Sequence, residues 1–232
     1  MKNKQIIVLA GGFGTRLKSI LNGLPKPLAD INGTPFLELL IDNLIKHGFD
    51  DFIFSLYFES DKIIERINSQ KDNKYGDVKI RFIVEDRALG TGGAISNVIY
   101  STEINDVFYV TNADTFLENG FENLETEEEN LIAVVKLADT GRFGNVEFDS
   151  NYIITAFKEK EDSAGEGFIN AGLYKLNKVI FSNWDKSSYS LERDLFPKLI
   201  SQRIIKAAVI QTNFIDIGIP EDYNKFCSLK RS

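Results

Sequence analysis

Residues 6–17 read IIVLAGGFGTRL, and this stretch decides the fold class. Its first half, Ile6–Ala10, is a short apolar run rich in β-branched residues, which predicts a buried strand. The glycines that follow, Gly11, Gly12 and Gly14, allow the backbone to approach a ligand closely and to turn its amides toward an anion. A strand that ends in such a loop predicts an α/β protein that binds a ligand at the end of that strand.

Two common phosphate-binding loops do not match this spacing. A P-loop requires a lysine directly after its last glycine, and no lysine stands there. A dinucleotide-binding loop requires a third glycine at the position that Leu17 occupies. The loop is therefore either a plain tight turn between a strand and a helix or a phosphate loop of a third kind.

The segment Leu24–Leu28, which reads Leu-Pro-Lys-Pro-Leu, favours the phosphate interpretation. The two prolines fix their own φ angles and restrict the residues before them, so Lys26 lies on a stiffened segment. A fixed cation suits a bound phosphate, although a plain surface turn would tolerate the same sequence. Together with Arg16 on the glycine loop, Lys26 makes the phosphate interpretation the stronger one.

Apolar runs with strand character alternate with helical patterns beyond this segment. The predicted strands are Ile6–Ala10, Asp51–Tyr57, Val78–Val84, Asp106–Thr111 and Leu131–Leu137. The predicted helices run from Pro35, with Thr34 as N-cap, to Gly48, over Ser60–Ser69, and onward from Gly93. This alternation predicts a Rossmann-like three-layer α/β/α fold, in which helices cover both faces of a mixed, mostly parallel sheet.

The later part of the chain is richer in strands. Phe143–Phe148 and Tyr152–Phe157 flank an Asp-Ser-Asn turn and predict a hairpin. The other predicted elements are strands at Phe168–Leu176, Ile204–Gln211 and Phe214–Ile217, a helix from its cap Ser190 to about Ile200, and a last helix that begins at Pro220. Because no repeat, linker or low-complexity stretch divides the chain, we predict one domain over residues 1–232 with a β-rich insertion.

The composition excludes several classes of function. The 232 residues contain 27 Lys or Arg and 34 Asp or Glu, and a net charge of −7 argues against a nucleic-acid partner. The one cysteine, Cys227, excludes an internal disulfide and a multi-cysteine metal site. The one histidine, His47, falls in the last turn of a predicted helix and is expected to be a helix-end residue. The chemistry must therefore rest on Lys, Arg, Asp, Glu and backbone amides.

No membrane partner is expected, because no apolar run approaches the roughly 18 residues of a spanning helix. Ile6–Ala10 is also shorter than the core of a signal peptide, about 7 to 15 residues, so a cytoplasmic location is the default expectation. The acidic stretch Glu125–Glu129 is expected to be a solvated surface rather than a metal site.

The motif Gly-Gly-x-Gly-Thr-Arg-Leu, followed by Pro-Lys-Pro-Leu, resembles the signature of the sugar-phosphate nucleotidylyltransferases. The resemblance continues in order along nearly the whole chain. Its further segments are Glu85 with Ala88–Ala94, Thr111–Thr115, Phe157–Lys160, Phe168–Tyr174, Ser190–Asp194 and Asp216–Tyr223. So many motifs in the same order are not expected by chance.

The resemblance implies an enzyme in which a sugar 1-phosphate oxygen attacks the α-phosphorus of a nucleoside triphosphate and pyrophosphate leaves. The attacking phosphate is already ionised, so the reaction needs no general base. The resemblance also implies Mg²⁺ as the cofactor, held by Asp114 and Asp216, although each aspartate alone would be an ordinary cap or turn residue. The implied catalytic residues are Arg16, Lys26 and Asp114.

Two binding halves follow from the same resemblance. The nucleotide-binding half, about 1–115, would use Leu9, Ala10, Gly11, Gly12, Gly14, Thr15, Arg16, Lys26, Glu85, Gly90, Thr91 and Asn112. The sugar-phosphate half, about 116–232, would use Gly144, Glu159, Lys160, Asn170, Ala171 and Gly172. In the sugar-phosphate half, Lys160 would bind the phosphate and Glu159 the sugar hydroxyls. Ala171 and Gly172 would leave space for the sugar ring. Alternatively, Glu159 and Lys160 would simply belong to a solvated edge strand. Glu161 departs from the family pattern, which often has proline there.

The resemblance to guanylyltransferases around Glu85 makes GTP the expected triphosphate. The Glu85 carboxylate can accept hydrogen bonds from N1–H and N2–H₂ of guanine. The same sequence would also suit a glutamate at a strand end that only faces water. The expected sugar is D-glycero-α-D-manno-heptose 1-phosphate, activated for surface polysaccharide. Mannose 1-phosphate with GTP, or a glucose or amino-sugar 1-phosphate with UTP or dTTP, remains open.

A non-catalytic nucleotide-sugar sensor on the same fold is the alternative from another functional class. Such a protein should have lost Lys26, Asp114 or Asp216, and all three are present. Proteins of this family assemble as dimers or tetramers, so a homo-oligomer is open as well, but no exposed apolar face can be assigned to it from the sequence.

Overall fold

The computed structural model describes residues 4–21, 23–158 and 165–230. The strands are β1 (Gln5–Leu9), β2 (Asp30–Ile31), β3 (Thr34–Pro35), β4 (Asp51–Leu56), β5 (Lys79–Val84), β6 (Val107–Asn112), β7 (Thr115–Leu117), β8 (Leu131–Leu137), β9 (Asn145–Phe148), β10 (Ile154–Lys158), β11 (Gly167–Asn177), β12 (Lys206–Ile210) and β13 (Phe214–Asp216). The α-helices are α1 (Lys18–Leu21), α2 (Phe36–Lys46), α3 (Ser60–Lys74), α4 (Gly90–Ser101), α5 (Phe196–Ser201) and α6 (Pro220–Leu229). Short 3₁₀ turns cover Thr15–Leu17, Lys26–Leu28, Phe121–Leu124 and Lys178–Phe181, and a π-turn covers Leu191–Leu195.

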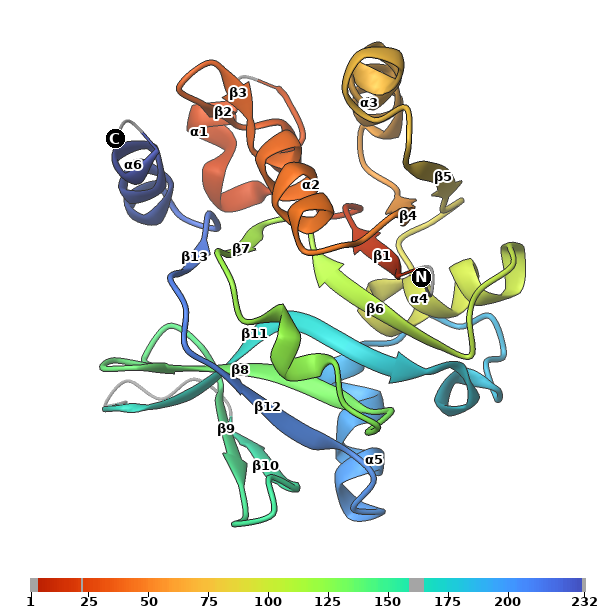
Figure 1. Cartoon of the computed structure of the whole chain (residues 1–232), viewed down its shortest axis with the longest axis vertical. Helices are drawn as coiled ribbons and strands as arrows, with labels where there is room; N and C mark the ends of the chain where they lie inside the picture. Colours follow the sequence, from red (N-terminus) through yellow and green to blue (C-terminus); the bar gives the residue numbers. More distant parts are fainter. Residues whose placement is uncertain (1–3, 22, 159–164, 231–232) are drawn as a thin grey trace.

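A mixed sheet forms the centre of the molecule (Figure 1). Within the described residues its strand order is β10-β9-β11-β6-β1-β4-β5, and β8 pairs with both β11 and β12. β1 pairs in parallel with β4 and β6, and β4 pairs in parallel with β5. β11 is antiparallel to β6, β8 and β9. The predicted Rossmann-like mixed sheet, with a β-rich later part, is therefore confirmed.

Helices cover both faces of the parallel strands because alternate residues of each strand point to opposite sides. Ile6 and Val8 of β1 pack in one apolar cluster with residues of α2 and α3. Ile7 of β1 and Ile53 of β4 pack in a second cluster with residues of α4 and α5. Figure 1 shows α2 and α3 above the parallel strands and α5 below the sheet. The sheet is thus buried on both sides, and its strand ends remain for ligands.

The structure corrects the predicted start of α2. Thr34 is not a helix cap and Pro35 is not the first helical residue, because both belong to β3, which pairs with β2. The turn between these strands is Asn32-Gly33, with φ angles of 54° and 94°. Both angles are positive, as a two-residue hairpin turn requires, and Asn-Gly is the usual sequence for it. The Asn32-Gly33 dipeptide is thus the sequence signal for this hairpin, and it was not used in the prediction.

The structure also corrects the start of α4, which begins at Gly90 rather than after Gly93. A Cβ atom on Gly92 would lie 2.2 Å from the Tyr189 ring, and one on Gly90 would lie 2.6 Å from the Tyr189 carbonyl oxygen. The glycines of this turn are therefore required for close packing of the segment around Tyr189 across the helix start. These glycines made the helix start hard to predict from the sequence, because glycine is unfavourable in helices and typical of loops.

Other predicted elements agree with the structure. β8 covers the predicted Leu131–Leu137, and α6 begins at Pro220. The Ser190 hydroxyl accepts a hydrogen bond from the backbone N–H of Arg193 at 3.3 Å, as a helix cap does. The helix that follows starts as a π-turn before α5, and α3 extends to Lys74, five residues past its predicted end.

Candidate active site

A cavity of about 440 Å³ lies at the carboxyl ends of β1, β4 and β6. In an open α/β sheet this edge is where ligands bind. The expected nucleotide residues that line it are Leu9, Ala10, Gly11, Gly12, Gly14, Arg16, Lys26, Glu85, Gly90, Thr91 and Asn112. Thr15 begins the 3₁₀ turn Thr15–Leu17, directly after Gly14. Phe13, Ser55 and Tyr57 also line the cavity, and no binding role was predicted for them.

The glycine loop packs directly on the proline-flanked lysine. Gly14 has a φ of +60°, and a Cβ atom there would lie 2.9 Å from the Cβ atom of Lys26. Only glycine allows this approach without displacing the lysine. Gly12 differs, because nothing lies within 4 Å of its Cβ position. The backbone at Gly12 therefore faces open space in the cavity and can approach a bound phosphate.

The two glycines Gly12 and Gly92 should respond differently to alanine. Gly92→Ala should lower the free energy of unfolding by about 1–3 kcal/mol, because the new Cβ atom collides with the Tyr189 ring. Gly12→Ala should change it by less than about 0.5 kcal/mol, yet weaken triphosphate binding, because the methyl group enters the cavity. Urea unfolding and calorimetric titration with GTP measure the two effects. Equal stability of both variants, or full GTP affinity in Gly12→Ala, would contradict this assignment.

Lys26 lines the cavity and lies between two aspartates. Its Nζ is 2.7 Å from Oδ2 of Asp114 and 3.7 Å from Oδ1 of Asp216. The Lys26 side chain is 9% exposed, so its charge is held in one place. Burial raises the pKa of Asp216, the Asp114 charge raises it further, and the Lys26 and Arg16 charges lower it. The two carboxylates therefore repel one another and depend on nearby positive charge.

A small two-stranded sheet brings these aspartates together. Asp114 precedes β7, and Asp216 ends β13 and lies opposite Thr115 of β7. The backbone N–H of Ile217 also donates to the carbonyl oxygen of Asp114 at 3.0 Å. β7 was not predicted, because three residues are too short for a strand pattern in the sequence. The pairing joins positions that lie far apart in the chain.

The aspartate pair fits a magnesium ion in its donor chemistry. Magnesium takes a few carboxylate oxygens and fills its remaining positions with phosphate oxygens and water. Over residues 4–21, 23–158 and 165–230, no cluster of three or more His, Cys, Asp or Glu side chains could hold a metal. A metal on this pair must therefore take its other ligands from a bound phosphate and solvent.

Glu85 also lines the first cavity. It is 8% exposed, and its Oε1 accepts a hydrogen bond from the Ser55 hydroxyl at 3.1 Å. Its Oε2 accepts from the backbone N–H of Leu89 at 3.0 Å. Burial raises the pKa of Glu85, while these two donors lower it. Each carboxylate oxygen keeps a second lone pair, so the group can accept two further hydrogen bonds from a ligand.

Several polar groups at the start of α4 are bonded to the segment Tyr189–Glu192. The backbone N–H groups of Gly92 and Gly93 both donate to the Tyr189 carbonyl oxygen, at 3.0 and 3.2 Å. The Thr91 hydroxyl donates to Glu192 at 3.0 Å and accepts from the backbone N–H of Leu191 at 2.9 Å. Gly90 and Thr91 line the cavity, but the Thr91 hydroxyl is already engaged with the neighbouring segment.

A second cavity, of about 800 Å³, adjoins the first. Arg16 and Asn112 line both cavities, so one ligand can reach from one to the other. Of the expected sugar residues, Gly144 and Asn170 line the second cavity. Asp216, Glu192, Arg193, Arg142 and Lys158 line it too. No role was predicted for Glu192, Arg193, Arg142 or Lys158, although all of these except Arg142 lie in segments of the family resemblance.

Two other expected sugar residues, Ala171 and Gly172, are described but do not line the second cavity. Ala171 is fully buried, and a Cβ atom on Gly172 would lie 2.5 Å from Nδ2 of Asn112. A side chain on Gly172 would therefore collide with the Asn112 amide, which lines both cavities. Glu159 and Lys160 lie outside the described residues.

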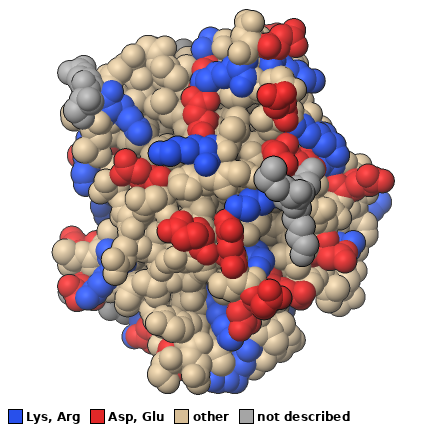
Figure 2. Space-filling model, in the orientation of Figure 1, with Lys and Arg blue, Asp and Glu red and all other residues tan. Residues whose placement is uncertain are grey.

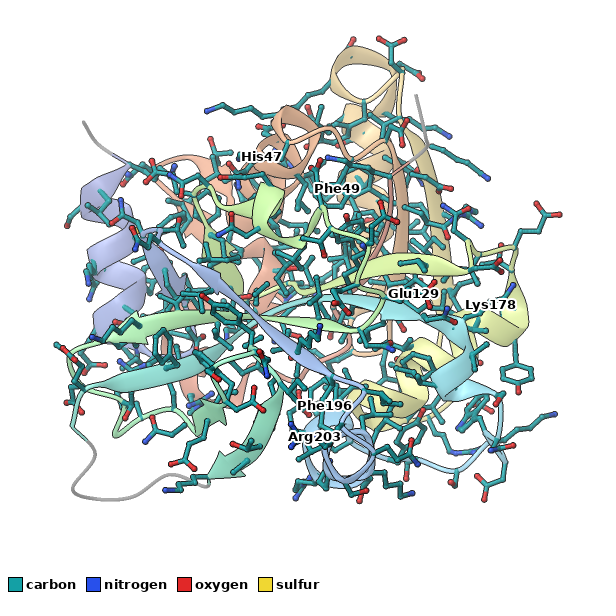
Figure 3. The ribbon with its side chains drawn as sticks, turned by 60° about the horizontal axis from the view of Figure 1, so that its bottom comes forward. His47, Phe49, Glu129, Lys178, Phe196 and Arg203 are labelled. Atoms are coloured by element: carbon teal, nitrogen blue, oxygen red, sulfur yellow. The ribbon has the colours of Figure 1, made fainter. Side chains whose placement is uncertain are left out.

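The remaining features of the sequence lie away from both cavities. His47 caps the end of α2, stacks on Phe121 and lies beside Phe49, far from Phe196 and Arg203 (Figure 3). The stretch Glu125–Glu129 is exposed, as expected, with Glu125 paired to Lys4 and Glu128 to Lys206.

Positive and negative side chains are interspersed over the face of the molecule that Figure 2 shows. Among the described residues, no helix has both the length and the apolar character needed to cross a membrane.

Comparisons with known proteins agree with this geometry. A family model described as nucleotidyl transferase matches residues 5–229. The D-glycero-α-D-manno-heptose 1-phosphate guanylyltransferase of Campylobacter jejuni is 37% identical over 227 residues, which cover 96% of this chain and 98% of that protein. The enzyme of the same name from Aneurinibacillus thermoaerophilus is 35% identical, covering 95% of this chain and 96% of that protein. The crystal structure of HddC from Yersinia pseudotuberculosis complexed with GMP-PN matches with a TM-score of 0.84 and 36% identity, over 98% of this chain and 99% of that chain.

Proposed function

The chain belongs to the nucleotidyl transferase family, and on this premise we propose that it transfers GMP from GTP to D-glycero-α-D-manno-heptose 1-phosphate. The products are a GDP-sugar and pyrophosphate. One observation carries the proposal: the Lys26 ammonium lies between Asp114 and Asp216, where the two cavities meet. That arrangement suits two phosphates that must be brought together and neutralised.

The reaction requires positioning and charge neutralisation rather than proton transfer. An ionised oxygen of the sugar 1-phosphate attacks the α-phosphorus of GTP, a new P–O bond forms, and the bond to the β-phosphate breaks. Pyrophosphate leaves with the electron pair of that bond. Lys26 and Arg16 counter the negative charge that develops, and fixed cations of this kind are worth most where water is excluded. His47, the one histidine of the sequence, lines neither cavity.

We propose that Asp114 and Asp216 hold Mg²⁺ beside the triphosphate. When bound, the ion supplies positive charge to the phosphate oxygens. Burial and then the Asp114 charge raise the pKa of Asp216, and a bound cation would relieve the repulsion between the two carboxylates. Asp114 lies two residues beyond the end of β6, and Oδ1 of Asp216 accepts a hydrogen bond from the backbone N–H of Gly218 at 2.7 Å.

Glu85 is the proposed determinant of guanine recognition. Its carboxylate lies in the cavity wall beside Gly11, with a free lone pair on each oxygen. Guanine offers N1–H and N2–H₂ as two adjacent donors, whereas uracil, thymine and cytosine do not offer this pair. The relatives whose names specify guanylyl transfer, and HddC with its bound GMP-PN, support the same base.

Replacing Glu85 with glutamine should weaken GTP binding about 10- to 100-fold, because one acceptor of a charge-assisted pair is lost. In the wild type, GTP affinity should also fall as pH decreases through the Glu85 pKa. Burial raises that pKa above 4.5, and the protonated carboxyl group no longer accepts two hydrogen bonds. This pH dependence should disappear in Glu85→Gln. Calorimetric titration with GTP between pH 5 and 8 measures both effects.

Asp86→Asn is the matched control for Glu85→Gln. Asp86 is the neighbouring carboxylate, its side chain is 83% exposed, and it does not line either cavity. The control should bind GTP like the wild type. An unchanged GTP affinity in Glu85→Gln would overturn the assignment of the base.

The proposed sugar rests on the two heptose 1-phosphate guanylyltransferases, which match over nearly their full length. The acceptor phosphate would be bound by Lys160 and the sugar hydroxyls by Glu159, Asn170 and the wall around Gly144. Mannose 1-phosphate with GTP is the runner-up, and glucose or amino-sugar 1-phosphates with UTP or dTTP come next. A non-catalytic sensor is disfavoured, because Lys26, Asp114 and Asp216 are all present and grouped.

The proposal divides the chain by role. Residues of about 1–115 bind the nucleotide, and residues of about 116–232 bind the sugar phosphate. The proposed catalytic residues, Arg16, Lys26 and Asp114, lie where the two cavities adjoin. We also propose that the GDP-sugar feeds surface polysaccharide and that the reaction takes place in the cytoplasm, where GTP is supplied.

Pyrophosphate release tests this function directly. The purified protein with Mg²⁺ is offered each pairing of GTP, UTP, dTTP, CTP and ATP with heptose, mannose and glucose 1-phosphates. We expect the fastest release with GTP and the heptose 1-phosphate. Release only with UTP or dTTP would overturn the base, and no release with any pairing would overturn the enzyme assignment for these sugars.

A further inference from the structure

Hydrogen bonds connect the start of α4 to the second cavity through Glu192. One carboxylate oxygen of Glu192, Oε2, accepts from the Thr91 hydroxyl at 3.0 Å and from the Ser190 hydroxyl at 2.7 Å. The other oxygen, Oε1, faces the Tyr174 hydroxyl at 3.4 Å, a long hydrogen bond. Glu192 itself lines the second cavity. Its carboxylate is therefore held from both sides.

The connection continues from Tyr174 to Asn170. Tyr174 is fully buried, and its hydroxyl oxygen accepts a hydrogen bond from Nδ2 of Asn170 at 2.9 Å. Oδ1 of Asn170 accepts from the backbone N–H of Gly172 at 3.0 Å. Both ends of the Asn170 amide are thus occupied once, and the amide lines the second cavity.

The charge of Glu192 fixes the direction of every bond in this connection. An ionised carboxylate only accepts, so the single hydroxyl proton of Tyr174 points toward Glu192. The Tyr174 oxygen then presents a lone pair to Asn170, and Asn170 must donate to it from its NH₂ group. Burial and the Glu192 charge both raise the pKa of Tyr174, so the hydroxyl keeps its proton.

We propose that Tyr174 is a positioning residue for sugar recognition: its hydroxyl, oriented by Glu192, fixes which end of the Asn170 amide faces which way. Asn170 then offers the cavity one remaining N–H and one remaining Oδ1 lone pair in a set arrangement. This inference rests on the proposed function, because it takes a sugar 1-phosphate as the ligand of the second cavity.

A fixed amide has a consequence for specificity. An asparagine side chain has nearly the same shape in its two orientations, but its donor and its acceptor exchange places between them. With Tyr174 present, only sugars whose hydroxyls match the set donor and acceptor bind well. Without the Tyr174 hydroxyl, only the backbone N–H of Gly172 orients the Asn170 amide. The amide can then rotate by 180° and exchange its donor and acceptor, so discrimination between sugars should fall.

The test is the variant Tyr174→Phe, which removes the hydroxyl and keeps the ring against Phe196. Calorimetry measures its affinity for heptose, mannose and glucose 1-phosphates and, separately, for GTP. We expect about a tenfold loss of affinity for the preferred sugar 1-phosphate, a smaller preference between the sugars, and a GTP affinity within about twofold of wild type.

Tyr75→Phe is the matched control. Tyr75 is 1% exposed, its hydroxyl has no hydrogen-bond partner within the described chain, and it lines neither cavity. The affinity of the Tyr75→Phe variant for every sugar 1-phosphate should equal that of the wild type. Melting temperatures of both tyrosine variants show whether each is folded.

A double-mutant cycle separates positioning from a general loss of structure. If Tyr174 acts through Asn170, Tyr174→Phe should change sugar affinity less than about twofold in an Asn170→Ala background. An undiminished effect in that background, an equal loss of GTP affinity, or no effect at all would overturn the inference. Sugar binding without turnover in the wild type would instead overturn the proposed function, and failure to bind any sugar 1-phosphate would overturn both.

Discussion

Lys26→Ala is expected to lower kcat by two to three orders of magnitude while the protein remains folded. Lys26 supplies a buried charge at a place that its neighbours fix, between Asp114 and Asp216 and on a proline-stiffened turn. Loss of one such preorganised group costs about 2.7–4 kcal/mol of transition-state stabilisation. Alanine also leaves the two carboxylates facing one another without the ammonium. Steady-state kinetics at saturating GTP and sugar 1-phosphate measure the effect.

Lys62→Ala is the control for Lys26→Ala. The Lys62 side chain is 42% exposed, pairs with Glu59 and lines neither cavity. Its kcat should stay within about twofold of the wild type, because an exposed ion pair contributes little. A kcat near the wild-type value in Lys26→Ala would show that the catalytic centre lies elsewhere.

Asp114→Asn should lower kcat by at least two orders of magnitude and raise the Mg²⁺ concentration needed for half-maximal activity. Asparagine keeps the size of the side chain but removes its charge, so the pair with Asp216 holds a divalent cation more weakly. The same change removes one partner of Lys26, whose Nζ lies 2.7 Å from Asp114. Rates measured across a Mg²⁺ series separate a metal-binding loss from a simple loss of rate.

Asp106→Asn is the control at the opposite end of the same strand. Asp106 directly precedes β6, whereas Asp114 follows it, and the Asp106 side chain is 82% exposed in an ion pair with Lys178. Its kcat and Mg²⁺ dependence should match the wild type. If Asp114→Asn retained the wild-type Mg²⁺ dependence, the aspartate pair would not be the metal site.

The nucleotide side could be predicted from the sequence because its signals are local. A glycine loop directly follows a buried strand, and two prolines flank Lys26, so chain neighbours alone define these features. The structure groups Arg16, Lys26 and Asp114 around one cavity, as the resemblance implied. Their catalytic roles remain predictions.

Pairings over long distances could not be predicted in the same way. β7 has three residues and no alternating pattern, yet its pairing with β13 brings Asp216 to Asp114. The glycines near Gly92 resemble a ligand-binding loop in the sequence, but Tyr189 occupies the space beside them. In both cases the decisive contact comes from a segment about a hundred residues away, about which local periodicity carries no information.

The central claim is that this chain makes a GDP-heptose, and one competition reaction tests it most directly. Equal concentrations of GTP, UTP, dTTP, CTP and ATP are incubated with Mg²⁺, the protein and a mixture of heptose and mannose 1-phosphates. Mass spectrometry separates every product, because the bases differ in mass and heptose has one more carbon than mannose. We predict that GDP-heptose is the main nucleotide sugar formed. A product carrying another base, a GDP-mannose excess, or the absence of any nucleotide sugar would contradict the claim.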